Sequence, residues 1–328
     1  MTKLTIAAVQ AEPIWLDKAE TTTKTINLIA QAAAGGADLV AFPELWVPGF
    51  PVFLFSHPVY AQSGFVARYH AESLTAAGEE IGRIAAAARE HGIVVVVGFS
   101  EKVAGTLYMS QMIIDADGEI ALHRRKLKPT HVERSLFGES DGSGIRVAST
   151  TAGRVGALNC FEHLQPLTKY AMFHQNEQIH VAAWPCLGIM GDVPAMSPDA
   201  LKSASRVYAL EGGVFVATAS QIMSDAGAAV FADASGSCPI YTGGGGIAAV
   251  FGPDSAELST PLPTAEEGIV YATIDFASID LARNTVDPTA HYARTDVFQL
   301  LFDDRPKAPV IRIDDERPAL GAVAEAIA

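Results

Sequence analysis

The chain has 328 residues, of which 49% are hydrophobic, so it can bury a sizeable core as one large α/β domain or as two smaller ones. Its formal net charge of −14 argues against a nucleic-acid or anionic-membrane partner, because such partners need clustered Lys and Arg. Three cysteines make no disulfide framework and fit a reducing compartment. The first residues lead directly into a predicted strand without a signal-peptide pattern, and no apolar run approaches the roughly 18 residues of a membrane span. We therefore expect a cytoplasmic protein.

The first part of the chain alternates predicted strands and helices. Apolar residues recur at steps of three and four after Ser73, so Ser73 is expected to cap a helix that Gly92 ends. In chain order we expect a strand over 4–10, a helix over 21–34, a strand over 39–42, the helix after Ser73 and a strand over 93–98.

The alternation continues through the second part. The dipeptide Asp117-Gly118 predicts a hairpin turn between strands 108–115 and 119–127. Residues 243–246 form a glycine run without a following Gly-Lys-Ser/Thr, so we interpret it as a flexible turn rather than a phosphate-binding loop. We further expect strands over 145–149, 154–159, 179–183 and 214–220, helices over 166–175 and 198–211, and a turn at 252–255. This order predicts a layered α/β fold.

Cys160 stands where the predicted strand 154–159 ends and a segment able to form a helix begins. A thiol at such a junction faces the unpaired N–H groups of the helix start, which favour the thiolate and can bind an oxyanion. A lone cysteine is more often a packing residue, and we assign that role to Cys186 and Cys238. Two other stretches favour a reactive role for Cys160.

The first of these stretches is the short apolar strand 39–42, which is followed by Pro43-Glu44 and then by Trp46. A carboxylate between a proline and an aromatic residue is poorly solvated. Desolvation raises the pKa of such a carboxyl group toward the range in which a general base works near neutral pH.

The second stretch is the basic strand end over residues 123–128, with Glu133 shortly after it. Taken singly, each of these charges would be a solvated surface group or a member of an ion pair. We keep that interpretation for Arg124, Arg125 and Lys128 and set Lys126 apart. Glu44, Lys126 and Cys160 each lie at the carboxyl end of a predicted strand, which is where open α/β sheets gather reactive groups. A thiol, a base and a cation form a complete set for acyl-type transfer.

Three motifs carry a resemblance to a known family. They are Phe42-Pro43-Glu44, the run Arg-Lys-Leu-Lys-Pro-Thr at 125–130, and the run Leu-Asn-Cys-Phe-Glu-His-Leu-Gln-Pro-Leu at 158–167. In this order they resemble the Glu-Lys-Cys triad of the nitrilase superfamily, the carbon-nitrogen hydrolases, and the last two are similar to its nitrilase branch. The resemblance extends from 7–10 to 287–292. The branch usually has Trp where this chain has Phe161, a change that keeps an aromatic wall but removes an indole N–H donor.

The resemblance implies a four-layer α-β-β-α sandwich. It also implies a homo-oligomer, a dimer or a larger assembly, paired through helices. We expect one carbon-nitrogen hydrolase domain over 1–297 and a C-terminal extension over 298–328 that lies at a subunit interface.

The implied reaction is hydrolysis of a small-molecule nitrile to a carboxylic acid and ammonia through a covalent thioimidate and thioester on Cys160. Glu44 would be the base, Lys126 would stabilise the developing negative charge, and Glu133 would fix Lys126. The aromatic residues expected on the substrate side are Phe50, Phe161 and Trp184. No cofactor is expected, and no metal, because His131, His163 and His291 lack metal-ligand spacing.

Other functions are compatible with the same residues. An amidase, a carbamoylase or a cyanide hydrolase would use the same triad and differ in pocket shape. A catalytically silent binding protein on the same scaffold is the alternative from a different class, although such a protein has no physical need for Glu44, Lys126 and Cys160 at three strand ends.

Overall fold

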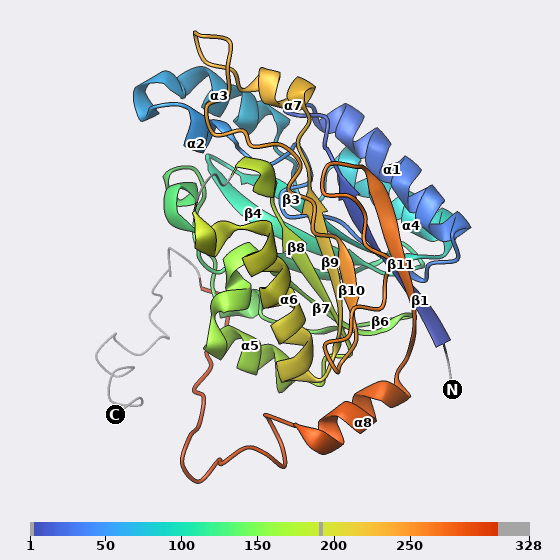
Figure 1. Cartoon of the computed structure of the whole chain (residues 1–328). Helices are drawn as coiled ribbons and strands as arrows, with labels where there is room; N and C mark the ends of the chain where they lie inside the picture. The colour runs from blue at the N-terminus through green and yellow to red at the C-terminus, as the bar shows by residue number, and fades with distance from the viewer. Residues whose placement is uncertain (1–2, 190–192, 308–328) are drawn as a thin grey trace, which may run out of the picture.

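The computed structural model describes residues 3–189 and 193–307. Within this part of the chain, eleven strands form one extended sheet that folds into two facing halves, with helices on both outer sides (Figure 1). None of the described helices is long and apolar enough to span a bilayer.

The first half of the sheet carries the N-terminal elements. β1, β2 and β3 are parallel, β4 is antiparallel to β3, and β5 is antiparallel to β4, so β5 ends at the same edge as β2 and β3. β11 pairs with β1 along its length. The bounds are β1 Lys3–Ala11, β2 Leu39–Ala41, β3 Val94–Val103, β4 Thr106–Ile114, β5 Ile120–Arg125 and β11 Gly268–Asp275; helices α1 Lys18–Ala34 and α4 Glu79–His91 cover this half.

The second half of the sheet joins the first through a short parallel pairing at Gln10–Ser220 and Ala11–Gln221. β7, β8 and β9 run parallel, while β6 and β10 pair antiparallel with β7 and β9. The bounds are β6 Ala148–Thr150, β7 Gly153–Asn159, β8 Ile179–Trp184, β9 Phe215–Gln221 and β10 Ala249–Phe251; helices α5 Pro166–Phe173 and α6 Pro198–Gly212 cover this half.

Three clusters of buried side chains define the layers. Between the halves, Val96 from the first packs in one cluster with Val181 from the second. Ile84 of α4 packs with the outer face of the first half, and Tyr208 of α6 with that of the second. This confirms the predicted α-β-β-α arrangement, in which burial of apolar faces on both sides of each half supplies the main stabilisation.

The prediction of a helix capped by Ser73 is wrong. α4 begins at Glu79, after Gly78, because the chain before it pairs with the end of β3: Leu74 N–H donates to Ser100 O at 2.8 Å, and Lys102 N–H donates to Leu74 O at 2.7 Å. The Ser73 hydroxyl instead donates to Tyr69 O at 2.7 Å. Five further elements are not predicted by the sequence patterns: α2 Phe53–Ser56, α3 Ser63–Glu72, α7 Asp225–Val230, α8 Ala277–Thr285 and β11.

The segment that follows α8 returns to the body of the protein. Phe298 and Phe302 line a pocket of about 720 Å³ together with residues of α5, and Lys307 N–H donates to Asp141 Oδ2 at 2.6 Å. Residues 308–328 of the predicted extension lie outside the described residues, so the division at 297 and the interface role of the extension stay predictions.

Candidate active site

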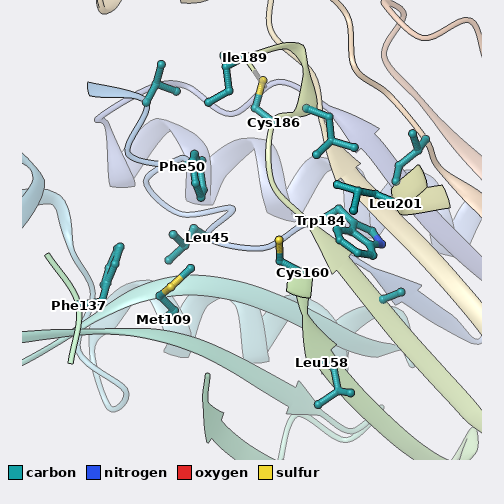
Figure 2. Close-up of a cluster of buried hydrophobic side chains, with 14 of the residues drawn as sticks. Leu45, Phe50, Met109, Phe137, Leu158, Cys160, Trp184, Cys186, Ile189 and Leu201 are labelled. Atoms are coloured by element: carbon teal, nitrogen blue, oxygen red, sulfur yellow. The ribbon is translucent and has the colours of Figure 1, made fainter. Parts of the chain in front are cut away.

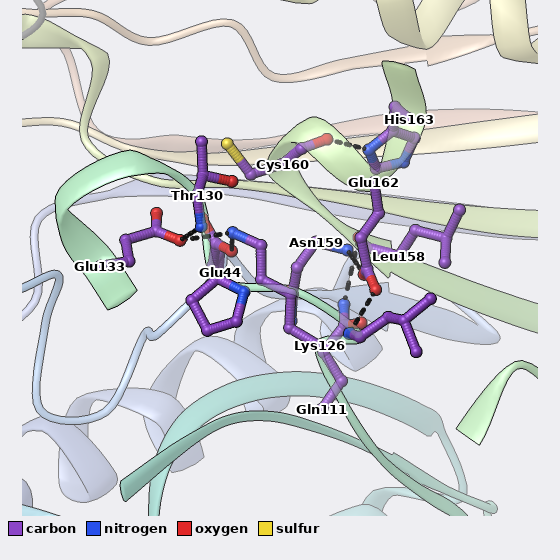
Figure 3. A network of polar contacts seen from close by, with 12 residues as sticks. Glu44, Gln111, Lys126, Thr130, Glu133, Leu158, Asn159, Cys160, Glu162 and His163 are labelled. Carbon is purple, nitrogen blue, oxygen red and sulfur yellow. Dashed lines mark hydrogen bonds and ion pairs between the residues drawn. The ribbon is translucent and has the colours of Figure 1, made fainter. Parts of the chain in front are cut away.

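Glu44, Lys126 and Cys160 lie together at one edge of the two sheet halves (Figure 3). Glu44 follows β2, Lys126 follows β5 and Cys160 follows β7, so strands from both halves deliver the three side chains. Each residue is at most 5% exposed. The predicted convergence of these strand ends is therefore present in the fold.

Lys126 is the centre of the polar network. Its Nζ donates to Glu44 Oε1 at 2.9 Å and to Glu133 Oε2 at 2.9 Å. Glu133 Oε2 also accepts from Thr130 N–H at 2.6 Å. Glu44 Oε2, in contrast, is buried and has no hydrogen-bond partner among the described residues. One carboxylate oxygen in the site is therefore free to accept a proton.

The backbone around Glu44 is fixed from several sides. Gln221 Nε2 donates to Glu44 O at 2.7 Å and to Leu45 O at 3.1 Å, and Glu44 N–H donates to Trp184 O at 3.3 Å. Trp46 Nε1 donates to Thr25 Oγ1 at 2.7 Å, which ties the same loop to α1. These contacts hold the carboxylate on rigid elements, as a positioned catalytic group requires.

Burial and neighbouring charges set the protonation of the site. Burial raises the pKa of Glu44 to about 8, although attraction to Lys126 opposes the shift. Burial also works against the charge on Lys126, but Glu133 and Glu44 outweigh it and raise the pKa of the ammonium group. Lys126 therefore stays charged while Glu44 can gain and lose a proton near neutral pH.

The thiol differs from the expectation that the helix start favours the thiolate. Burial, and then the negative charge of Glu44, raise the pKa of Cys160 well above its usual value, against the smaller effects of Lys126 and of the Phe161 N–H hydrogen bond. The helical segment after the strand is only the short 3₁₀ turn Cys160–Leu164. The free site thus holds a thiol, and formation of the thiolate requires a base.

Local backbone strain accompanies the site. Leu45, His131 and Cys160 each have a φ of 47°, the left-handed region that residues other than glycine seldom adopt. Such conformations cost about 1–3 kcal/mol each and persist only where the surroundings enforce them. Leu45 follows Glu44, His131 lies two residues before Glu133, and Cys160 carries the thiol, so each of these groups has a strained residue at or near it.

A buried ion pair that the sequence analysis missed links two of the strand ends. Arg124 Nη2 donates to both oxygens of Glu162 at 2.7 and 2.9 Å. Glu162 also accepts from Leu127 N–H at 2.9 Å and from Asn159 N–H at 2.8 Å. Arg124 was expected at an exposed strand end or in an ion pair, and it is buried and paired. The sequence contains a signal for this burial: Arg124 and Lys126 are two residues apart in the predicted strand 119–127, so their side chains are expected on the same face of the sheet.

The residues predicted on the substrate side lie at different depths. Phe161 is half-buried and lines a pocket of about 280 Å³ with Thr130 and Arg134. Trp184 is fully buried, its ring stacked on His163 and its Nε1 donating to Ser205 Oγ at 2.8 Å.

Phe50 lies across from Cys160 in the buried cluster drawn in Figure 2, which also contains Trp184. Phe161 thus borders a pocket, while the side chains of Phe50 and Trp184 are fully buried. All three substrate contacts stay predictions. Within residues 3–189 and 193–307, no three His, Cys, Asp or Glu side chains gather as metal ligands would.

Comparison with known proteins identifies the family. The model of the carbon-nitrogen hydrolase family matches residues 5–284. The chain belongs to the carbon-nitrogen hydrolase family. An aliphatic nitrilase of Rhodococcus rhodochrous is 48% identical over 307 residues, which cover 93% of this chain and 84% of that protein. A bromoxynil-specific nitrilase of Klebsiella pneumoniae subsp. ozaenae is 47% identical over 94% of this chain and 88% of that protein.

Among solved structures, a carbon-nitrogen hydrolase from Helicobacter pylori G27 superposes with a TM-score of 0.71. The match covers 90% of this chain and 97% of that one at 20% identity, so it bears on the fold alone. Membership of the carbon-nitrogen hydrolase family and the four-layer fold are therefore both established for this chain.

Proposed function

We propose that the protein is a nitrilase that hydrolyses an organic nitrile to the carboxylic acid and ammonia, with Cys160 as the nucleophile. Two observations support this assignment. Several relatives that match more than nine-tenths of the chain at 47–48% identity are named nitrilases. The residues that such a reaction needs form one buried cluster around Lys126.

In the first step, the free Oε2 of Glu44 takes the proton from the Cys160 thiol, and the sulfur adds to the nitrile carbon. A C–S bond forms while one π bond of the nitrile breaks, which puts negative charge on nitrogen. The ammonium group of Lys126 and the N–H of Phe161 stabilise this charge, and the proton held by Glu44 completes a neutral thioimidate.

In the second step, Glu44 removes a proton from water as the water oxygen adds to the thioimidate carbon. Glu44 returns that proton to nitrogen, and the tetrahedral intermediate then collapses with cleavage of the C–N bond while its hydroxyl proton passes through Glu44 to the departing nitrogen, which leaves as ammonia. A thioester on Cys160 remains. A second water, activated in the same way, cleaves the C–S bond, releases the carboxylic acid and restores the thiol, so two waters are consumed per nitrile.

Glu133 acts through Lys126 in this scheme. Its Oε2 is held by Thr130 N–H and contacts Lys126 Nζ, so it fixes the ammonium group between the two carboxylates. Phe161 would form the aromatic wall at the pocket side and Trp184 and Phe50 the deeper apolar surroundings.

The observation that carries the proposal is the buried Glu44 Oε2, which has no hydrogen-bond partner among the described residues, while Oε1 of the same carboxylate binds Lys126 Nζ. The test is ammonia release by the purified protein from a panel of nitriles and a matched panel of amides. We expect release from nitriles with formation of the acid. Release from amides alone would make the protein an amidase, and release from neither would favour a binding protein on this scaffold.

We also propose that the chain forms a homo-oligomer through the outer helices. α5 and α6 form one outer layer of the molecule (Figure 1) and expose four apolar side chains, Leu164 just before α5, Leu167 on it, and Val207 and Leu210 on α6. A patch of this kind on a water-exposed layer is typical of an interface. Light scattering coupled to size exclusion tests it: a dimer or larger species is expected, and Leu167→Glu should shift the mass toward the monomer. A monomeric wild type would refute it.

A further inference from the structure

A chain of buried hydrogen bonds that the proposed mechanism does not use leads to the backbone of the nucleophile. Glu177 Oε1 lies 2.6 Å from His180 Nδ1, and His180 Nε2 lies 3.0 Å from His163 Nε2. His163 Nδ1 lies 2.7 Å from Cys160 O. At the far end, the Tyr208 hydroxyl donates to Glu177 Oε2 at 2.7 Å. Four side chains from three different segments thus converge on one peptide carbonyl.

The surroundings keep this chain in one geometry. His163, Glu177, His180 and Tyr208 are each at most 1% exposed. The His163 ring stacks on Trp184, and the His180 ring stacks on Tyr208 with centroids 3.7 Å apart. Gly156 of β7 leaves the space that the Glu177 carboxyl group occupies, since a Cβ there would overlap Oε1. Side chains packed in this way have no alternative rotamer at low cost.

Which atom donates in each of these hydrogen bonds follows from the last acceptor, the Cys160 carbonyl oxygen. A peptide carbonyl only accepts hydrogen bonds, so His163 Nδ1 must carry a hydrogen. Burial lowers the pKa of His163 and of His180, so His163 is neutral, its Nε2 has no hydrogen, and His180 Nε2 donates to it. His180 Nδ1 and Glu177 Oε1 then share one proton. Each of the three hydrogen bonds holds one proton and the group of three side chains is neutral, as deep burial requires.

Holding the Cys160 carbonyl also orients the group on the opposite side of the same peptide. The peptide unit is planar and trans, so Cys160 O and the N–H of Phe161 point in opposite directions. Figure 3 shows the Cys160 carbonyl directed to His163 and the sulfur on the other side, toward Lys126 and Glu133. The Phe161 N–H faces that sulfur. Rotation of this peptide would move the N–H away from the atom on which negative charge forms.

We propose that His163, backed by His180 and Glu177, is a positioning residue that fixes the strained Cys160–Phe161 peptide so that the Phe161 N–H points at the developing anion. The inference rests on the proposed function for the assignment of Cys160 as nucleophile. It adds to the triad a set of residues that never touch the substrate and act through one peptide plane.

Two substitutions of His163 separate positioning from structural support. In His163→Asn, the amide nitrogen takes the place of Nδ1 and can still donate to Cys160 O, while the link to His180 is lost. In His163→Gln, the amide takes the place of Nε2 and can accept from His180, while the link to Cys160 O is lost. The Asn variant should be the less stable one, because it leaves the His180 N–H buried without a partner.

The expected activities run in the opposite order to the stabilities. His163→Asn should keep kcat within about tenfold of wild type, whereas His163→Gln should lose about 100-fold in kcat with KM nearly unchanged, because the displaced donor acts in the transition state. Glu177→Gln can donate to His180 and accept from Tyr208 as a protonated Glu does, so it preserves the hydrogen-bond chain and should lose much less kcat than His163→Gln. If kcat follows the melting temperature across these variants, or if His163→Gln has wild-type kcat, the positioning role is refuted.

A measurement on the wild-type protein decides the matter even if a variant fails to fold. In ¹⁵N-histidine-labelled protein, one histidine protonated on Nδ1 should show coupling through its bare Nε2 to the protonated Nε2 of a second histidine. A His163 ring protonated on Nε2 would overturn the inference. Wild type that releases no ammonia would refute the proposed function instead, and this NMR result does not depend on activity.

Discussion

At the scale of single residues, the site combines a buried thiol with a carboxylate oxygen that has no hydrogen-bond partner in the described part of the chain. The Cys160 thiol is neutral in the free protein because burial and Glu44 raise its pKa. Glu44 Oε2 accepts no hydrogen bond from residues 3–189 and 193–307. Attack therefore depends on transfer of one proton between two buried groups, and each of them can be tested separately.

Replacement of the thiol should remove turnover and leave the fold unchanged. Cys160→Ala deletes one sulfur atom, and ammonia release from nitriles should fall to background because no covalent intermediate can form. Cys186→Ala and Cys238→Ala are the matched controls and should retain activity, since neither thiol belongs to the cluster around Lys126. Mass spectrometry of protein quenched during turnover should find an acyl adduct at residue 160 of the wild type. An adduct on Cys238, or activity in Cys160→Ala, would show that the nucleophile is misassigned.

The pH dependence of kcat/KM should report the ionisation of Glu44. The base works as the carboxylate, and the pKa of Glu44 is raised to about 8. Activity should therefore be low in acid, rise as the pH approaches about 8 and then level off. Glu44→Gln should lose essentially all activity, while Glu133→Gln should keep the rise because its role is to hold Lys126. A flat profile from about pH 5 to about pH 8 would be inconsistent with Glu44 as the base.

At the scale of elements, the place of Glu44 depends on how closely the loop after β2 lies against β3. Gly98 of β3 has no side chain, and a Cβ there would collide with Pro43 O and come within 3.0 Å of Leu45 N. These are backbone atoms on both sides of Glu44 that cannot rotate away. The glycine is thus needed for contact between two backbones, the role that glycine often has inside strands.

Substitution of Gly98 should displace the catalytic base Glu44 without changing the Glu44 side chain itself. Gly98→Ala should push the Pro43-Glu44-Leu45 backbone away from β3, and a displacement of about 1 Å can cost about 100-fold in rate. We also expect a loss of about 1–3 kcal/mol in the free energy of unfolding from overpacking. Gly82→Ala is the control, because its Cβ would have open space within α4. The experiment compares kcat and thermal unfolding of the two variants, and wild-type kcat in Gly98→Ala would contradict the account.

At the scale of the whole molecule, the active site joins the two halves of the sheet. Lys126 comes from the first half and Cys160 from the second. Glu162 binds the backbone next to both, since it accepts from Leu127 N–H and from Asn159 N–H while paired with Arg124. The relative position of the halves at this edge and the geometry of the site are therefore controlled by the same buried carboxylate.

Removal of that carboxylate should destabilise the protein strongly. Glu162→Gln leaves the charge of Arg124 buried without its partner, which costs about 3–5 kcal/mol for buried pairs. Asp296→Asn breaks an ion pair at the surface and serves as the control, with little change in melting temperature expected. Chemical denaturation of both variants measures the difference. Equal stability of Glu162→Gln and wild type would show that the buried pair adds nothing beyond a neutral hydrogen bond.

The stabilisation that two buried glutamates provide should be lost as the pH rises from about 4.3 to about 8. Burial raises the pKa of both Glu44 and Glu177 to about 8, whereas unfolded glutamates ionise near about 4.3. The folded state thus binds more protons between these values, and the stabilisation present at low pH is lost as the pH rises toward about 8. Glu177→Gln removes one such group, so its melting temperature should drop less than that of wild type between about pH 6 and about pH 9. The exposed Glu90→Gln is the control, and an identical drop in all three proteins would contradict this origin.

The amino-acid sequence by itself determined which segments end in reactive side chains. The strand before Glu44, the hairpin at Asp117-Gly118 and the strand before Cys160 all have local signals, namely apolar runs, turn residues and their spacing. Because parallel strands end at a common edge, these local signals were sufficient to predict that the three residues converge.

The tertiary structure decided the features that depend on distant partners. Ser73 has a good local signal for a helix cap, yet pairing of the neighbouring Leu74 with the end of β3 places it elsewhere. The pairing of Arg124 with Glu162, 38 residues away, and the contact of His163 with His180, 17 residues away, likewise join separate segments of the sequence. Propensity and periodicity report on a few neighbouring residues, whereas the partner of a buried charge or imidazole is set by which elements pack together, and that is known only once the sheet halves have closed on each other.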